Sequence, residues 1–243
     1  MATDTPSDPP ERTDDVCGAA RAAGEPEPGG ALDGPAGDGA DASDPEAAGA
    51  DVELEPPTEP DPGQAPPAVT ELAAACVRFV ATRYGAMLDF TPDTLSLVDQ
   101  WLREARTELA ARPEAAEVVQ SAAGAYLGEV MRRCFGGEWF ADGDPSGWRL
   151  YLSRVYCAYN PVGMAREALL LETAEGWHAH FELDPGERDA VEARLAALPP
   201  AEDDEFYAPT TRFDVLSIVF EALRESLRSR GLDDVRFTAQ DYA

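Results

Sequence analysis

Two histidines and one glutamate occupy alternate positions in the segment GWHAHFEL, residues 176–183. Alternating polar and apolar residues are typical of a half-buried strand, on which residues two apart point to the same face. His178, His180 and Glu182 would then share one face, and two imidazoles with one carboxylate form a ligand set for zinc or iron. The same pattern also fits the polar outer face of an amphipathic strand. We favour this second interpretation, because short histidine motifs often occur without a metal.

A single acid interrupts the apolar segment GAYLGEVMRRCFGGEW, residues 124–139, which we expect to be a buried helix that ends at a double glycine and runs into a strand. Glu129 could be a catalytic carboxylate, because carboxylates with perturbed pKa values are concentrated at functional sites. It could also be one half of a structural ion pair, since Arg133 lies four residues later in the favourable orientation. An unpaired buried carboxylate would be costly. We therefore expect Glu129 to pair with Arg133 or with an arginine of another element, and we predict no catalytic residue.

Several classes of chemistry are excluded by residues that the chain lacks. All 19 basic residues are arginine, so Schiff-base chemistry and a phosphate-binding loop lysine are ruled out. There is no GxSxG nucleophile motif and no glycine-rich phosphate loop. The cysteines have no CxxC spacing, and we expect free thiols in a reducing compartment. The segment DGDPSG, residues 142–147, lacks the ligand series of a calcium loop and should be a hairpin turn. We expect no cofactor.

Charge and composition divide the chain in two. Residues 1–66 contain 17 acids, two arginines and no aromatic residue, whereas residues 67–243 contain 30 acids, 17 arginines and every aromatic residue. The first segment has too little apolar surface to offset the entropy of ordering, so we expect a disordered acidic tail. Residues 67–243 have the size of one domain. The net charge of −28 should repel nucleic acid and anionic membranes, and the partner that fits it is another protein, in particular a basic one.

Hydrophobic periodicity predicts an α+β fold, with helices flanking a small, mostly antiparallel sheet. Helices are expected at residues 70–84, 91–109, 113–134, 161–172, 185–198 and about 209–230. On the second helix the apolar stripe consists of Leu95, Val98, Leu102, Ala105 and Leu109. Strands are expected at residues 138–140, 149–159 and 176–183, and a last short strand at residues 235–238.

A resemblance to a known family supports this outline. The segments AYLGEVMRRCFGGEW, LDFTPDTLSLVD and YNPVGMAREALL together resemble an uncharacterised bacterial domain family of unknown function. The likeness covers roughly residues 69–171. The residues that carry it, or that we expect to support the fold beside it, are Tyr126, Gly128, Glu129, Arg133, Gly137 and Trp139. The resemblance implies an α+β domain and no established activity.

The compartment and the function follow from the same observations. The segment MATDTPSDPPERTDD lacks the basic and apolar regions of a signal peptide, and no apolar run is long enough to span a membrane. We therefore expect a cytoplasmic protein, and a composition rich in Ala, Gly, Pro and Arg is typical of a GC-rich bacterial genome. The sequence predicts a non-enzymatic protein-interaction domain. The alternative is a metal-dependent enzyme that uses His178, His180 and Glu182.

Overall fold

The computed structural model describes residues 63–242, and the predicted disordered tail lies almost entirely outside these residues. Seven α-helices and four strands follow one another along the described chain. The helices are α1 (Pro67–Tyr84), α2 (Leu95–Leu109), α3 (Ala116–Phe135), α4 (Pro161–Leu170), α5 (Arg188–Leu195), α6 (Asp203–Phe206) and α7 (Pro209–Ser229). The strands are β1 (Gly137–Phe140), β2 (Arg149–Leu152), β3 (Cys157–Tyr159) and β4 (Glu182–Leu183). Short 3₁₀ helices are η1 (Pro92–Thr94), η2 (Pro113–Ala115), η3 (Pro145–Gly147) and η4 (Ala239–Tyr242). The α+β prediction is confirmed.

The central element is α3, which is buried on all sides from Gln120 to Arg132. Two glycines on this helix allow close packing of other elements. A Cβ atom on Gly124 would lie 2.4 Å from the Cα atom of Val162 in α4, and one on Gly128 would lie 2.2 Å from the ring of Trp139 in β1. Both distances are too short for a side chain, so glycine is required where α4 and β1 approach α3.

The helix boundaries are set by proline, asparagine and glycine. Pro161 occupies the first turn of α4, and the Asn160 side chain accepts a hydrogen bond from the Val162 N–H at 2.9 Å. This arrangement satisfies one of the free N–H groups at the start of the helix. Gly85 ends α1 at its C-terminus. Its φ is 66°, a backbone conformation that glycine adopts without strain.

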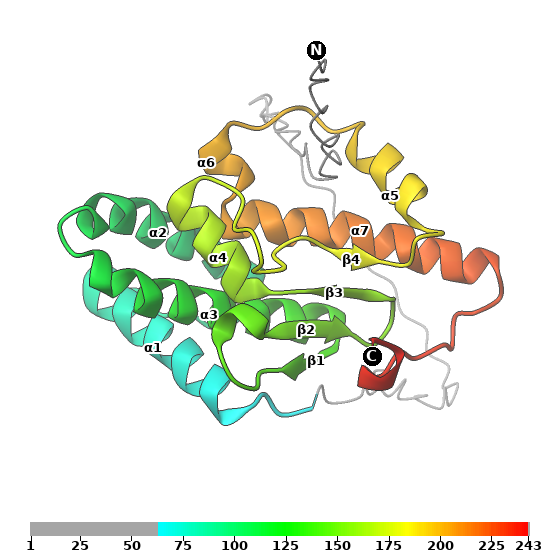
Figure 1. Ribbon diagram of the computed structural model, residues 1–243, viewed down its shortest axis with the longest axis horizontal. Coiled ribbons are helices and arrows are strands. Elements are labelled where there is room, and N and C mark those ends of the chain that lie inside the picture. The colour runs from blue at the N-terminus through cyan, green and yellow to red at the C-terminus, as the bar shows by residue number, and fades with distance from the viewer. Residues whose placement is uncertain (1–62, 243) are drawn as a thin grey trace, which may run out of the picture. The chain divides into compact units, whose positions relative to one another are not determined.

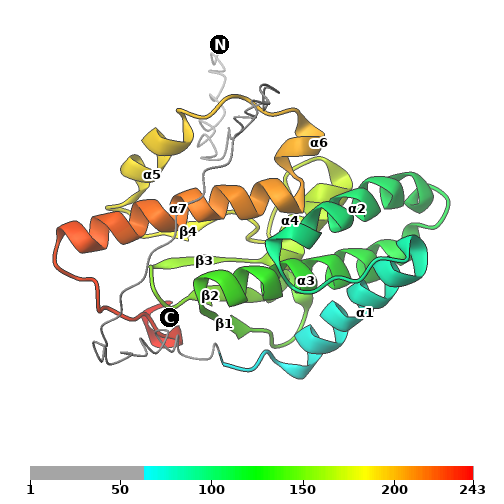
Figure 2. The same ribbon diagram turned by 180° about the vertical axis from the view of Figure 1, so that it is seen from behind.

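The four strands form one antiparallel sheet in the order β1-β2-β3-β4. Its inner face packs on the helices, and Figures 1 and 2 show α3 and α7 on this side. The outer face is turned toward the viewer in Figure 1, where none of the described α-helices crosses β2 and β3. One row of residues across the outer face consists of Glu138, Tyr151, Ala158 and Glu182. We call the side of the sheet that carries this row the outer sheet face.

Three strand predictions were wrong in detail. The predicted strand 149–159 is interrupted by a bend at residues 153–156, so it forms two strands that pair with each other. In the segment 176–183 only Glu182 and Leu183 are extended in a strand. Residues 235–238 form no strand. The hairpin turn expected at residues 142–147 is confirmed, because it joins the antiparallel pair β1 and β2.

Candidate functional site

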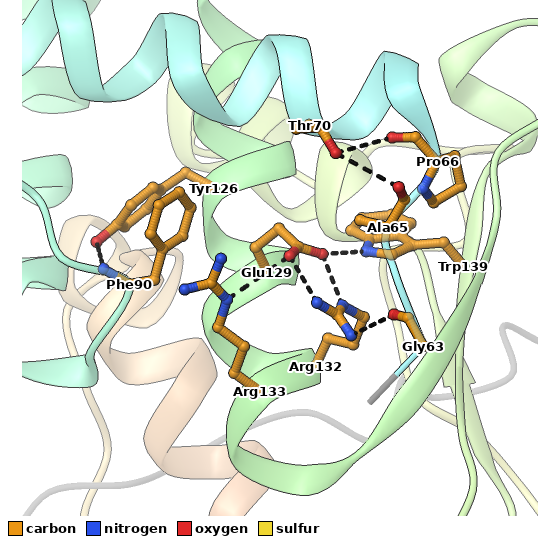
Figure 3. A network of polar contacts seen from close by, with 10 residues as sticks. All are labelled: Gly63, Ala65, Pro66, Thr70, Phe90, Tyr126, Glu129, Arg132, Arg133 and Trp139. Carbon is orange, nitrogen blue, oxygen red and sulfur yellow. Dashed lines mark hydrogen bonds and ion pairs between the residues drawn. The ribbon is translucent and has the colours of Figure 1, made fainter. Parts of the chain in front are cut away.

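Glu129 lies in the middle of α3 and is held by three donor groups (Figure 3). The Arg132 guanidinium donates two hydrogen bonds to its carboxylate, from Nε to Oε1 at 2.8 Å and from Nη2 to Oε2 at 2.9 Å. The indole Nε1 of Trp139 donates a further hydrogen bond to Oε1 at 2.8 Å. The Glu129 and Arg132 side chains are only 4% and 7% exposed. The carboxylate is therefore neutralised inside the protein.

The main partner of Glu129 differs from the one predicted. Arg133 Nε lies 3.7 Å from Glu129 Oε2, and its side chain is 45% exposed. Its guanidinium is 4.0 Å from the centre of the Phe90 ring, within range of a cation–π interaction. Arg132 is the closer partner because it points into the core, where its Nη1 also donates to the Gly63 carbonyl oxygen at 2.7 Å. The ion pair predicted between residues 129 and 133 is thus a secondary contact.

The other motif residues surround the same part of α3. The Tyr126 hydroxyl accepts a hydrogen bond from the Phe90 N–H at 3.0 Å and shares another with the Thr94 hydroxyl at 2.7 Å. Trp139 packs against Gly128, as described above. These contacts tie α3 to β1 and to the segment before α2. The motif residues brought together here have partners within the domain.

A second buried carboxylate, Glu167 in α4, was not predicted. Its side chain is 0% exposed, and Oε2 accepts a hydrogen bond from Arg212 Nη2 at 2.7 Å. Oε1 accepts another from the Ala174 N–H at 3.1 Å. The Arg212 guanidinium also lies 4.7 Å from the centre of the Phe206 ring. No local spacing could have indicated this pair, because its members are 45 residues apart in α4 and α7.

The two histidines do not share a strand face. His178 is exposed and has a φ of 51°, which is incompatible with an extended strand. His180 turns toward the helices, and its Nε2 atom lies 3.6 Å from Glu167 Oε1. Glu182 lies on the outer sheet face. Within residues 63–242, no group of three His, Cys, Asp or Glu side chains is placed to hold a metal ion.

Aromatic rings gather at one end of the sheet, where two residues of the C-terminal segment contact β2 and the bend before β3. The Tyr156 and Tyr242 rings are stacked, with centroids 4.5 Å apart and an angle of 13° between their planes. The Tyr151 ring lies 4.6 Å from Tyr242, and the Phe237 ring lies 5.8 Å from Tyr156. All four residues are partly exposed. Sequence periodicity did not indicate this cluster, because three of its four members lie outside the strands.

The hydroxyl of Tyr242 anchors the cluster to the bend between β2 and β3. It accepts a hydrogen bond from the Cys157 N–H at 2.9 Å and lies 2.8 Å from the Leu152 carbonyl oxygen. The Val155 carbonyl oxygen is 3.0 Å away. Burial raises the pKa of this hydroxyl, so it stays protonated at neutral pH and can donate to these carbonyl groups.

Acidic side chains lie beside the rings. Burial raises the pKa of Tyr156, and the negative charges of Glu182 and Asp184 raise it further. The negative charges that disfavour the Tyr156 phenolate would stabilise a cationic group beside its ring. The candidate functional site is therefore the outer sheet face around Tyr156.

Comparisons with known proteins give no further indication of function. No family model, no curated protein and no solved structure matches the chain. None of the helices among residues 63–242 is long and apolar enough to cross a membrane.

Proposed function

We propose that this protein is a non-enzymatic domain that binds another protein through its outer sheet face. The observation that carries the proposal is the cluster of partly exposed rings on a sheet face that no described α-helix covers (Figure 1). Tyrosine is enriched at protein interfaces, because its ring provides a large contact area and its hydroxyl can bond to water or to a partner. Phe140, which is 49% exposed at the end of β1, extends the same face.

The buried carboxylates support a binding role more than a catalytic one. A general base needs a lone pair within reach of its substrate. Glu129 and Glu167 are instead enclosed, and each accepts hydrogen bonds from an arginine and from one further N–H group. Their contacts hold α3, α4 and α7 in place.

The charge of the domain indicates what kind of protein would bind. Residues 63–242 contain 30 acids and 17 arginines. Such a surface attracts basic partners and accelerates their association, and this attraction weakens as salt rises. We therefore propose a basic protein as the partner.

The proposal is tested with two double variants of the full chain. Phe140→Ala with Tyr151→Ala removes aromatic surface from the outer sheet face. Met87→Ala with Val118→Ala is the matched control, because these two apolar residues are 70% and 52% exposed and lie outside the sheet. Each protein is cross-linked in extracts of the cells that make it, and the cross-linked proteins are identified by mass spectrometry.

We expect one basic protein to be cross-linked by the wild type and by the control, and to be lost with the face variant. The purified partner should then bind the wild type with defined stoichiometry. If every cross-linked protein is retained equally by the face variant, the outer sheet face is not an interaction surface and the proposal fails.

A further inference from the structure

β1 is an edge strand, because in the order β1-β2-β3-β4 it pairs with β2 on one side only. The Ser153 N–H donates to the Gly136 carbonyl oxygen at 3.4 Å, so the next pair, Gly137 with Leu152, is of the kind that exchanges no hydrogen bonds. The two kinds of pair alternate along an antiparallel ladder, so Trp139 belongs to the same kind. Gly137 and Trp139 therefore direct their N–H and C=O groups to the free side of β1.

These outward backbone groups have no hydrogen-bond partner among residues 63–242. Figures 1 and 2 show the segment before α1 passing beside β1, but the hydrogen bonds of this segment go elsewhere. The Gly63 carbonyl oxygen accepts from Arg132 Nη1 at 2.7 Å, and the Pro66 carbonyl oxygen accepts from the Thr70 hydroxyl at 3.2 Å. β1 thus keeps main-chain donors and acceptors that an extended chain can complete.

The side chains of β1 make this edge part of the proposed interaction surface. Trp139 is 7% exposed and packs on α3, whereas Glu138 and Phe140 are exposed on the outer sheet face. Glu138 lies directly opposite Tyr151 of β2, so the edge is continuous with the aromatic part of that face. A strand added to β1 would place every second side chain on the outer sheet face, beside Glu138 and Phe140.

Charge distinguishes the chains that could occupy this edge. Residues 1–66 contain 17 acids and two arginines, so they would bring further acids beside Glu138. Two copies of the chain carry a net charge of −28 each and repel one another. Antiparallel pairing of two copies about Trp139 would also place Glu138 of each copy opposite Phe140 of the other, where no basic side chain meets the carboxylate. A basic segment is attracted by the same charge.

We infer that an extended basic segment of the partner protein adds to β1 as an antiparallel strand. This inference rests on the proposed function and gives the way in which the partner is bound. The partner residue opposite Trp139 exchanges both main-chain hydrogen bonds with it, and such bonds supply affinity when a strand is added to a sheet. The residues before and after it lie opposite Phe140 and Glu138, which favours an apolar side chain and an arginine. The recognised sequence is therefore an apolar residue, any residue and an arginine, in that order.

The test follows the Trp139 amide group in the full chain by NMR. The probe is the blocked peptide Thr-Val-Thr-Arg-Thr, whose central threonine would lie opposite Trp139. Of the four tryptophans, only Trp139 follows a glutamate, and residues 1–66 contain no tryptophan. Cell-free synthesis with glutamate labelled at its carbonyl carbon and tryptophan labelled at its amide nitrogen therefore gives a single correlation, from Glu138 to Trp139. Peptide that binds to the acidic residues 1–66 leaves this signal unchanged.

Two methylated peptides provide the matched comparison. A methyl group on the nitrogen of the central threonine removes the N–H that would bond to Trp139. A methyl group on the nitrogen of the valine removes an N–H that would point away from β1. We expect the parent peptide to shift the Trp139 amide resonance saturably and to slow its hydrogen exchange. The affinity should fall at least about 5-fold with the central methyl group and less than about 2-fold with the valine methyl group.

A pair of protein variants tests the side-chain part of the inference. Glu138→Gln removes the charge that would meet the arginine of the peptide, and Glu114→Gln removes one exposed charge near the start of α3. We expect the peptide affinity to fall about 2- to 5-fold with Glu138→Gln and to change little with Glu114→Gln. No saturable shift of the Trp139 amide, equal affinities of the two methylated peptides, or equal effects of the two variants would overturn the inference.

The other occupants of the edge give different results without any peptide. A Trp139 resonance that moves with protein concentration would assign the edge to a second copy. A Trp139 amide that exchanges slowly at every concentration would mean that the chain itself fills the edge, and either result overturns the inference. The proposed function would fail separately. A partner that is lost with the Phe140→Ala, Tyr151→Ala variant, together with no binding of the peptide at Trp139, would keep the interaction domain and exclude the added strand.

Discussion

Glu129 and Arg132 lie one turn apart on α3 and share two hydrogen bonds while both side chains are almost fully buried. Removing one member of a buried ion pair is costly, because the other member is left as an uncompensated charge. The indole N–H of Trp139 and the carbonyl group of Gly63 complete this network (Figure 3). The network joins α3, β1 and the segment before α1. Single substitutions of its members measure how much it contributes to the stability of the domain.

We expect Glu129→Gln to lower the free energy of unfolding by about 1–3 kcal/mol, because the charge-assisted contact to Arg132 is lost while an acceptor for Trp139 remains. Arg133→Gln is the matched control and should cost less than about 1 kcal/mol, since this side chain is half exposed. Urea denaturation followed by circular dichroism measures both values. An equal cost for Arg132→Gln and Arg133→Gln would contradict the assignment of Arg132 as the main partner.

Two buried tyrosines should respond in opposite directions to loss of the hydroxyl group. Tyr159 is 1% exposed, and its hydroxyl has no hydrogen-bond partner among residues 63–242. An unsatisfied buried hydroxyl is costly, so Tyr159→Phe should raise the unfolding free energy by about 1 kcal/mol. Tyr126→Phe should lower it by about 1–2 kcal/mol, because the bonds to Phe90 and Thr94 are lost. Thermal unfolding of both variants measures these changes in stability. A clear loss of stability in Tyr159→Phe would show that the Tyr159 hydroxyl is hydrogen-bonded in solution.

Asp99 should make stability depend on pH in the opposite sense to an ordinary surface carboxylate. It lies in α2, and it accepts hydrogen bonds from the backbone N–H and the hydroxyl of Thr210 at the start of α7. Burial raises its pKa, and the hydrogen bonds from Thr210 only partly oppose this effect. The native state therefore binds the proton more tightly than the unfolded chain, in which the pKa of aspartate is about 3.9.

It follows that the stability of the wild type should fall, relative to Asp99→Asn, as pH rises from about 3.9 through the higher pKa of the native state. Above that range the difference should be constant. Urea unfolding of both proteins at a series of pH values gives the comparison. A difference that grows more favourable to the wild type with rising pH would mean that the Thr210 bonds outweigh burial.

Local periodicity was sufficient for the six predicted helices, but it indicated neither the short helix α6, which lies in a segment expected to be an irregular acidic loop, nor the contacts between distant segments. In the predicted stripe of α2, Leu95, Val98, Leu102 and Ala105 are all buried, because spacing along a helix determines which residues share a face. The pairing of Glu167 with Arg212 has no such signal, since it depends on how α4 and α7 pack.

The segment 176–183 shows how tertiary packing can override an alternating pattern. Gly163 in α4 lies so close to this segment that an added Cβ atom would be 2.8 Å from the Trp177 carbonyl oxygen and 3.2 Å from the Ala179 Cβ. The chain follows the helix surface there, with a left-handed residue at His178, before it joins the sheet at Glu182. Ala179 is buried against α4 and not on a sheet face. The alternation of apolar and polar residues therefore reflects packing against a helix, not a half-buried strand.

The histidine pair provides the last prediction, which separates an interaction domain from a metal-dependent enzyme. A metal site needs ligand atoms that converge at about 2.0–2.2 Å from one point. His178 is exposed, His180 faces Glu167 and Glu182 lies on the outer sheet face, so the three do not converge. We expect elemental analysis of the purified full chain to show no stoichiometric zinc or iron. We also expect His178→Ala with His180→Ala to change the unfolding free energy by no more than about 1 kcal/mol, with the larger part from His180, whose Nε2 atom is buried. About one metal ion per chain in the wild type, lost in this double variant, would make the enzyme the better interpretation.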